Sequence, residues 1–404
     1  MSALFSDRGA HPLDARDSQL KLRGDRDGVR FAKLALVQTA LLVLTNAYWT
    51  QAEAFSVQTD TVAYAAIAEC RFAEDCGTLS SSFLGHHLYR WIPNMVVGAI
   101  SHEAALSLHH TYRLSSLVLI AAIVLLIHLM KVPLLNKVIF LALVLFNPYM
   151  TRTFLAVPEL IDHALFYLSV VGVVVGLVNR SRGILLVALL LAPFSRQTAL
   201  LLIPASLYVL WEDKDHSKQP RINSIWTFLL IPITVILGYT LSSLGSSLIF
   251  HGDSHSLVDH LAGIKDWFKE GASSAEFILR ALTYTATLIP LCLLTIDGKG
   301  LRLALIAAAM LAVQPVIAGP VITGPGVQRL LSFATPFLGL AFVHRAQSPL
   351  RAFFAMLSIF LISLHHKFSF IYEFDWSASQ YVAAVAVILV LILLVRWALL
   401  KKGA

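Results

Sequence analysis

The sequence predicts an all-α polytopic membrane protein of about 12 transmembrane helices, with a large first extracytoplasmic loop that contains interfacial helices. Apolar residues make up 57% of the 404 residues, charged residues only 14%, and the mean hydropathy is +0.73. Soluble globular proteins rarely reach such values. The apolar runs are long and unbroken, as a membrane-crossing helix of about 20 residues requires. The alternating pattern of a membrane barrel is not seen, so a helical bundle is expected.

The chain divides into a short polar tail and a membrane domain. Residues 1–30 are polar and mixed in charge, and they lack the apolar segment of a cleaved signal peptide. We expect them to form a cytoplasmic tail that is disordered or lies on the membrane surface. Residues 31–404 then form the membrane domain, in which residues 51–112 are the first extracytoplasmic loop.

Twelve apolar segments are predicted as helices, with boundaries uncertain by ~2–4 residues. They are residues 31–50, 113–130, 138–150, 158–178, 184–193, 196–211, 224–249, 276–295, 303–320, 329–345, 351–364 and 379–396. The fifth and sixth are too short for two full spans, so we expect a turn between them at residues 193–196.

The distribution of Lys and Arg predicts the orientation of the chain, because basic residues collect in cytoplasmic connections. The tail and alternate connections carry most of the 31 basic residues, so both termini are expected in the cytoplasm. Residues 88–108 are apolar enough for a short span, but a crossing there would invert every later connection. We therefore place this segment in the outer interface, which suits Tyr89 and Trp91.

The first loop holds the most concentrated set of polar candidates. Asp60 and Tyr64 are four residues apart, a spacing that puts both on one face of a helix. Asp60 either acts chemically or caps the helix that follows it, since Asp is a favoured N-cap. Cys70 and Cys76 are the only cysteines close in sequence, and they form either a disulfide or two free thiols.

Four short motifs resemble those of the GT-C membrane glycosyltransferases. In chain order they are Asp60 with Tyr64 in a large loop after the first span, Asn147-Pro148-Tyr149 through Pro158-Glu159, Phe194-Ser195-Arg196-Gln197 followed by Leu202-Ile203-Pro204, and Gln328-Arg329-Leu330-Leu331 with Pro336. In the last motif, Leu330 replaces the aromatic residue usual in the family. The resemblance extends over most of the chain in hydropathy and order.

This resemblance implies an enzyme that takes a sugar from a polyprenyl-phosphate carrier. The acceptor would be a glycan, a glycolipid or a protein on the extracytoplasmic side. Many members of the family have Asp-Glu at the first motif, whereas Thr61 follows Asp60 here and leaves that carboxylate alone. The loop has no Asp-x-Asp pair, so neither a metal nor another cofactor is expected, and no nucleic acid partner is predicted.

Transfer from a phosphate carrier needs a base for the acceptor hydroxyl and cations for the departing phosphate. We expect Asp60 to be the base, with Tyr64 orienting the carboxylate or the sugar. Arg329 is the first candidate for the phosphate and Arg196 the second, because a guanidinium group can donate two parallel hydrogen bonds. Either arginine could instead reach lipid headgroups. Further substrate-binding candidates are Arg152, Glu159, His87 and Arg90.

Some polar residues have a structural alternative. Glu159 follows Pro158 at the start of a predicted helix, a pair that stabilises a helix by itself. Asp162 and His163 lie one turn deeper, where polar residues are functional candidates; the alternative is that they pair with each other or with Arg152. The adjacent histidine pairs do not have the spacing of metal ligands.

We therefore expect an inverting membrane glycosyltransferase, located in a bacterial inner (plasma) membrane, with an extracytoplasmic active site. One alternative is a lipid-linked glycan polymerase or ligase, which should have its large loop late in the chain. Another is a non-enzymatic polyprenyl-lipid transporter or flippase, which should have paired halves with broken helices at matching positions. The sequence shows neither feature.

Overall fold

The computed structural model describes residues 12–46, 58–70, 90–147, 149–213, 225–250, 298–317 and 327–343, with single residues or short pieces between 348 and 360 and residues 390 and 394. Helices and their connections make up these residues, and no strand occurs among them, which confirms the all-α class. The predicted helix at residues 276–295 lies outside the described residues, as do His87, Cys76 and most of the last two predicted helices.

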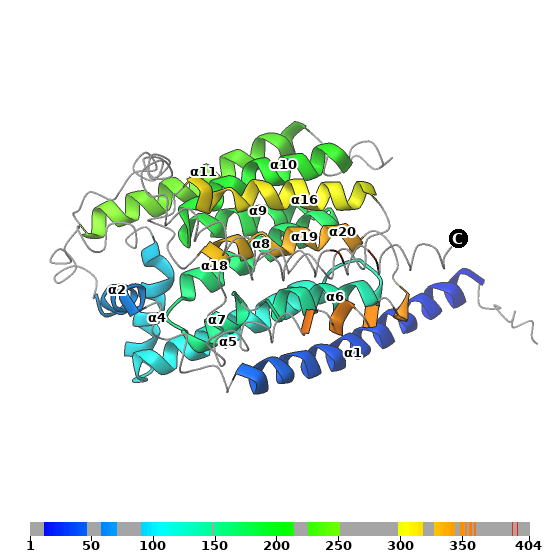
Figure 1. The fold of residues 1–404 in the computed structure, drawn as a ribbon, viewed down its shortest axis with the longest axis horizontal. Coiled ribbons are helices and arrows are strands. Elements are labelled where there is room, and N and C mark those ends of the chain that lie inside the picture. Colours follow the sequence, from blue (N-terminus) through cyan, green and yellow to red (C-terminus); the bar gives the residue numbers. More distant parts are fainter. Residues whose placement is uncertain are drawn as a thin grey trace, which may run out of the picture.

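The longer helices run side by side along the long axis of the molecule (Figure 1). They are α1 (Pro12–Asn46), α5 (Leu108–His128), α8 (Ile161–Asn179), α11 (Ile225–Phe250) and α16 (Gly298–Ala312). Each of them contains or overlaps a stretch long and apolar enough to cross a bilayer, which makes five candidate spans within the described part of the chain. These five helices indicate a membrane protein. The total of about 12 spans stays a prediction.

Shorter helices fill the spaces between the long ones. They are α6 (Leu134–Leu145), α7 (Thr151–Ala156), α9 (Arg182–Leu191), α10 (Leu202–Asp213), α18 (Val327–Ser332), α19 (Thr335–Leu338) and α20 (Leu340–Val343). Two 3-10 turns, η4 (Ala192–Phe194) and η5 (Gln197–Leu201), separate α9 from α10. The interruption expected at residues 193–196 is thus confirmed. The predicted helix at residues 329–345 consists of three short helices.

The bundle is centred on α8. This helix is apolar on nearly every side, and most of its residues are buried, as expected for a helix surrounded by others. A Cβ atom at Gly176 would lie 2.7 Å from the Leu185 backbone nitrogen, and one at Gly172 would lie 2.9 Å from the Ala188 Cβ. Because small residues four apart let two helices approach closely in a membrane, these glycines explain how α9 packs against α8.

The polar tail is helical from Pro12 onward and continues into the first span as part of α1. This differs from a disordered tail. Proline is favoured at the first position of a helix, and most of residues 13–23 are good or moderate helix formers. The helix therefore starts well before the apolar residues that predicted it.

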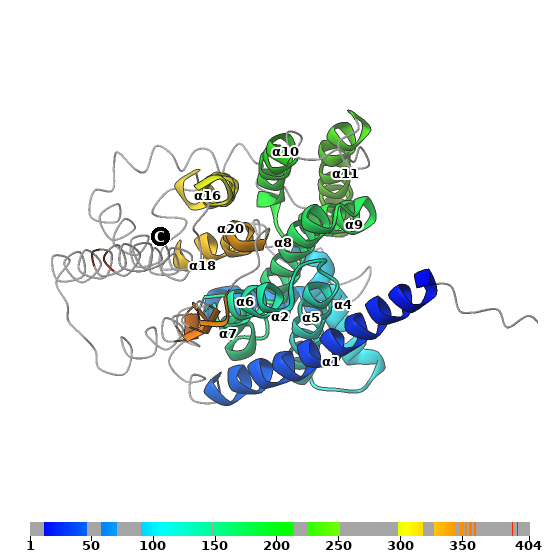
Figure 2. The same cartoon turned by 90° about the vertical axis from the view of Figure 1, so that its right-hand side faces the viewer.

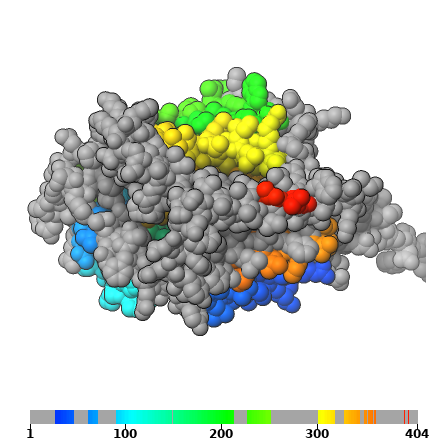
Figure 3. Space-filling view, in the orientation of Figure 1, coloured from blue at the N-terminus to red at the C-terminus, as the bar shows by residue number. Residues whose placement is uncertain are grey.

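Two helices of the first loop lie together at one end of the bundle (Figure 1). They are α2 (Gln58–Glu69) and α4 (Trp91–Glu103), and α4 is the helix expected within residues 88–108. The end-on view shows α1 on one margin and α10, α11 and α16 on the other (Figure 2). The space-filling view shows the same two margins, with α16 and α1 on opposite sides of one face (Figure 3).

Candidate functional site

Three helices meet through a buried hydrogen-bonded network. Arg90, just before α4, donates from Nη1 to the Tyr64 hydroxyl on α2 at 2.6 Å and to Asp162 Oδ2 on α8 at 3.3 Å. The Tyr64 hydroxyl in turn donates to the same Asp162 oxygen at 3.1 Å. Tyr64 and Asp162 are fully buried, and only 14% of the Arg90 side chain is exposed. Because hydrogen bonds between charged groups are stronger than neutral ones, this network ties α2, α4 and α8 together.

Arg196 lies beside this network, in the break between η4 and η5. It is 4% exposed, and its guanidinium carbon is 4.8 Å from the centroid of the Phe333 ring, a cation–π contact. Its Nε and Nη1 atoms are buried, and in the described part of the chain they have no hydrogen-bond partner. A buried cation whose hydrogen-bond donors have no acceptor costs free energy. The site therefore favours binding of an anion that accepts hydrogen bonds from these two nitrogens.

The charges around Arg196 form what we call the arginine cluster: Arg90, Arg196, Arg329 and Asp162, together with Tyr64. Arg196 interacts electrostatically with the other charged members of this cluster. The cluster as defined contains three arginines and one carboxylate, so it carries excess positive charge in an apolar bundle. Such a site attracts an anionic group, and the planar guanidinium fork matches phosphate oxygens.

Aromatic rings form one wall beside the cluster. Phe333, next to α18, lies 5.7 Å from the His163 ring and 4.8 Å from the Phe166 ring, measured between centroids. His163 is fully buried, and its Nε2 lies 3.9 Å from Asp162 Oδ2. The wall gives the arginine cluster a largely water-excluded side, in which charge interactions are stronger than in solvent.

Close packing of α2 against α4 fixes the positions of Tyr64 and Arg90. The Tyr112 hydroxyl on α5 lies 3.1 Å from the Tyr64 carbonyl oxygen and 2.9 Å from Asn94 Oδ1. Asn94 also donates from Nδ2 to the Arg90 carbonyl oxygen at 3.0 Å. At Gly98 the α4 backbone comes so near to Ala68 that a Cβ atom would lie 1.8 Å from its carbonyl oxygen. Only glycine permits this approach.

A second anchor joins α4 to α11. Trp91 donates from its indole nitrogen to the Ser242 carbonyl oxygen at 3.1 Å. The ring also lies against Gly245, where a Cβ atom would be 2.3 Å from it. The side chain predicted to sit in the membrane interface is therefore partly buried against a neighbouring helix.

The structure brings together four of the residues predicted to bind substrate: Tyr64, Arg90, Arg196 and Arg329. Glu159 is elsewhere, with Oε1 2.9 Å from His109 Nδ1. Pro158 and Glu159 lie in the turn before α8, which begins at Ile161, so the expected role of this pair in the first turn of a helix is wrong.

The remaining predicted residues have separate outcomes. Arg152 is fully buried in α7. Position 60 lies in the first turn of α2, which begins at Gln58, so the helix starts before Asp60 rather than after it. Cys70 is buried and disulfide-bonded, so the free-thiol alternative is wrong for this cysteine. His87 and Cys76 lie outside the described residues.

Two residues of the site were not assigned to it from the sequence. Asp162 was a candidate as an acid inside a span, but its hydrogen-bonded partners are Arg90 and Tyr64, 72 and 98 residues away, rather than Arg152. A pairing over such a distance leaves no local pattern. Phe333 had no sequence signal, because one phenylalanine in an apolar segment resembles any core residue.

The described residues contain no group of three or more His, Cys, Asp or Glu side chains that could hold a metal ion. Comparison of the chain with models of protein families, with curated proteins and with solved structures found no match.

Proposed function

We propose that this chain is an integral membrane glycosyltransferase that moves a sugar from a polyprenyl-phosphate carrier to an extracytoplasmic acceptor. The observation that carries the proposal is the arginine cluster, and above all the buried Arg196 with two guanidinium nitrogens left without a partner in the described structure. A lipid-linked phosphate offers what this site lacks: an anion with several acceptor oxygens on an apolar tail.

The placement of α2 links the cluster to the proposed base. Tyr64 belongs to the cluster, and position 60 precedes it by one helical turn on α2, so the two positions share one face of the helix. A carboxylate there would lie near the end of the carrier that bears the sugar. This arrangement supports Asp60 as the group that accepts a proton and Tyr64 as the group that orients the substrate.

The proposed reaction is a single displacement with inversion. Asp60 takes the proton of the acceptor hydroxyl while its oxygen forms a bond to the anomeric carbon. The bond from that carbon to the phosphate oxygen breaks, and its electron pair leaves with the polyprenyl phosphate. Arg196 and Arg329 stabilise the charge that develops on this leaving group, since fixed donors in a water-excluded site need no reorganisation.

The proposed location is a bacterial inner (plasma) membrane, with both termini in the cytoplasm and α2 and α4 on the extracytoplasmic side. The five candidate spans and the apolar composition support a membrane setting. Polyprenyl carriers place their phosphate at the membrane interface, which suits a cluster near one end of the bundle. The partners proposed are the lipid-linked donor, a glycan, glycolipid or protein acceptor, and the bilayer.

The test is transfer of radiolabelled sugar from polyprenyl-phosphate donors in membranes that contain the wild type, Asp60→Asn or Glu103→Gln. Glu103 is a matched control, because it belongs to the same loop and its side chain is 86% exposed. We expect Asp60→Asn to lower transfer by about 10²–10⁴-fold, the usual contribution of a general base, and Glu103→Gln to leave it unchanged.

Normal transfer by a correctly folded Asp60→Asn variant would remove this residue from the mechanism. Absence of transfer by the wild type with every donor tried would contradict the transferase itself, and carrier movement between vesicle leaflets would then be measured.

A further inference from the structure

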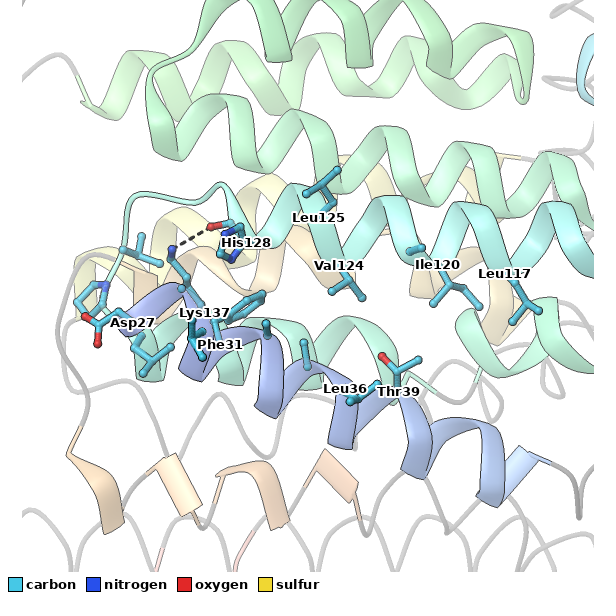
Figure 4. A pocket seen from close by; sticks show the side chains of 18 residues that line it. Asp27, Phe31, Leu36, Thr39, Leu117, Ile120, Val124, Leu125, His128 and Lys137 are labelled. Atoms are coloured by element: carbon cyan, nitrogen blue, oxygen red, sulfur yellow. Dashed lines mark hydrogen bonds between the residues drawn. The ribbon is translucent and has the colours of Figure 1, made fainter. Parts of the chain in front are cut away.

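An apolar groove of about 1060 Å³ runs between α1, α5 and the start of α6. It lies toward the end of α1 that is far from α2 and α4 (Figures 1 and 4). Figure 4 shows Phe31, Leu36, Ile120 and Val124 along its walls, with Lys137 at one end. The arginine cluster plays no part in its lining.

The groove has the length of one membrane leaflet. Its lining on α1 runs from Asp27 to Thr39, about 18 Å at 1.5 Å per residue, and its lining on α5 runs from Leu117 to His128, about 17 Å. The hydrocarbon core of a bilayer is about 30 Å thick, so one leaflet is about 15 Å. An acyl chain of a lipid in that leaflet would therefore fill the groove from end to end.

The polar end of the groove carries Lys137, a cation with more than one hydrogen-bond donor. Lys137 Nζ donates to the His128 carbonyl oxygen at 2.9 Å and lies 5.9 Å from the Phe31 ring centroid. An ammonium group has three donors, and among the described residues this carbonyl takes one of them. Asp27 lines the same end, but its carboxylate is shared with Arg30, 3.8 Å away. The end of the groove therefore suits a negatively charged headgroup.

We propose that this groove binds one phospholipid with an anionic headgroup, drawn from the leaflet predicted to face the cytoplasm. The lipid phosphate accepts hydrogen bonds from Lys137, and one acyl chain lies between α1 and α5. The cytoplasmic leaflet is the one rich in anionic lipids, which agrees with the basic residues at this end of the chain. The inference concerns a different site from the proposed glycosyl transfer and does not depend on it.

Native mass spectrometry of the full chain, purified in a mild detergent, tests this site. Phosphatidylglycerol and phosphatidylcholine of equal chain length are titrated into the wild type, Lys137→Gln, Ala121→Phe and Lys33→Gln. Ala121 is an exposed residue of the groove lining, so phenylalanine there fills the groove without changing its charge. Lys33 is exposed on α1 and does not line the groove, so its variant is the matched loss of one charge.

We expect the wild type and Lys33→Gln to bind phosphatidylglycerol about 5-fold more tightly than phosphatidylcholine, as one lysine near a charged headgroup allows. Lys137→Gln should lose this preference, and Ala121→Phe should lose binding of both lipids. Equal lipid binding by all four proteins would overturn the proposal. Displacement of the phospholipid by polyprenyl phosphate at equal concentration would also overturn it, because the groove would then hold the carrier. If Ala121→Phe does not fold, Lys137→Gln still decides the outcome.

Discussion

The substitution Gly98→Ala tests how α2 and α4 position the site. A Cβ atom at this position would lie 1.8 Å from the Ala68 carbonyl oxygen and 2.7 Å from its carbonyl carbon. Ordinary contacts start near 3.4 Å, so the two helices would have to separate by about 1.6 Å. The obstacle is backbone, which cannot rotate away as a flexible side chain can.

The separation has two expected consequences. Overpacking of this kind costs about 1–3 kcal/mol, so the free energy of unfolding should fall by that amount. The same movement would stretch the hydrogen bond between Arg90 and Tyr64, now 2.6 Å, beyond hydrogen-bonding distance. Under the proposed function, a displacement of this size should lower sugar transfer by about 100-fold.

Thermal unfolding of the purified protein measures the first consequence, and the radiolabelled transfer assay measures the second. Gly183→Ala is the matched control, since a Cβ atom there meets nothing within 4 Å. We expect Gly98→Ala to unfold at a lower temperature than both the wild type and this control. Identical unfolding temperatures for the two glycine variants would refute the close approach of α2 to α4.

Three further substitutions test other parts of the structure by thermal unfolding. Asp162→Asn removes the carboxylate that pairs with Arg90 and should destabilise the protein by about 3–5 kcal/mol, as loss of one partner of a buried pair does; an unchanged stability would contradict this pair. Gly176→Val introduces a Cβ atom 2.7 Å from the Leu185 backbone nitrogen and should cost at least about 1–3 kcal/mol, whereas a neutral result would mean that α9 does not pack closely on α8. Arg302→Gln removes an ion pair whose arginine side chain is 60% exposed and should change stability by about 0–1 kcal/mol, so a loss of several kcal/mol would show that this pair is not a surface one.

The helices followed from the sequence because hydropathy acts locally. The apolar segments that predicted α5, α8 and α11 are helices in the structure, long and apolar enough to cross a membrane, with ends that differ by a few residues. The start of α1 was missed because polar residues with high helix propensity extend the helix beyond its apolar part. Pattern alone does not separate such a helical tail from a disordered one.

The site was predictable as a set of residue types but not as an arrangement. Arg196 and Arg329 were chosen because arginine suits phosphate, and the structure places them in one electrostatic cluster. Asp162 joins the same cluster through contacts with residues far away in the chain, which depend on how α2, α4 and α8 pack. The close approach at Gly98 is of the same kind, since a glycine in an apolar helix gives no local sign of its neighbour.

Under the proposed function, the arginine cluster holds the phosphate of a polyprenyl carrier. Binding of polyprenyl phosphate to the purified wild type, Arg196→Gln and Arg113→Gln tests it most directly, with thermal unfolding as the check on folding. Arg113 is exposed on α5 and is the matched loss of one charge. We expect Arg196→Gln to weaken binding by about 10–100-fold, the value of one or two hydrogen bonds from a charged group, and Arg113→Gln to bind as the wild type does. Equal affinity of the wild type and a folded Arg196→Gln variant would contradict it.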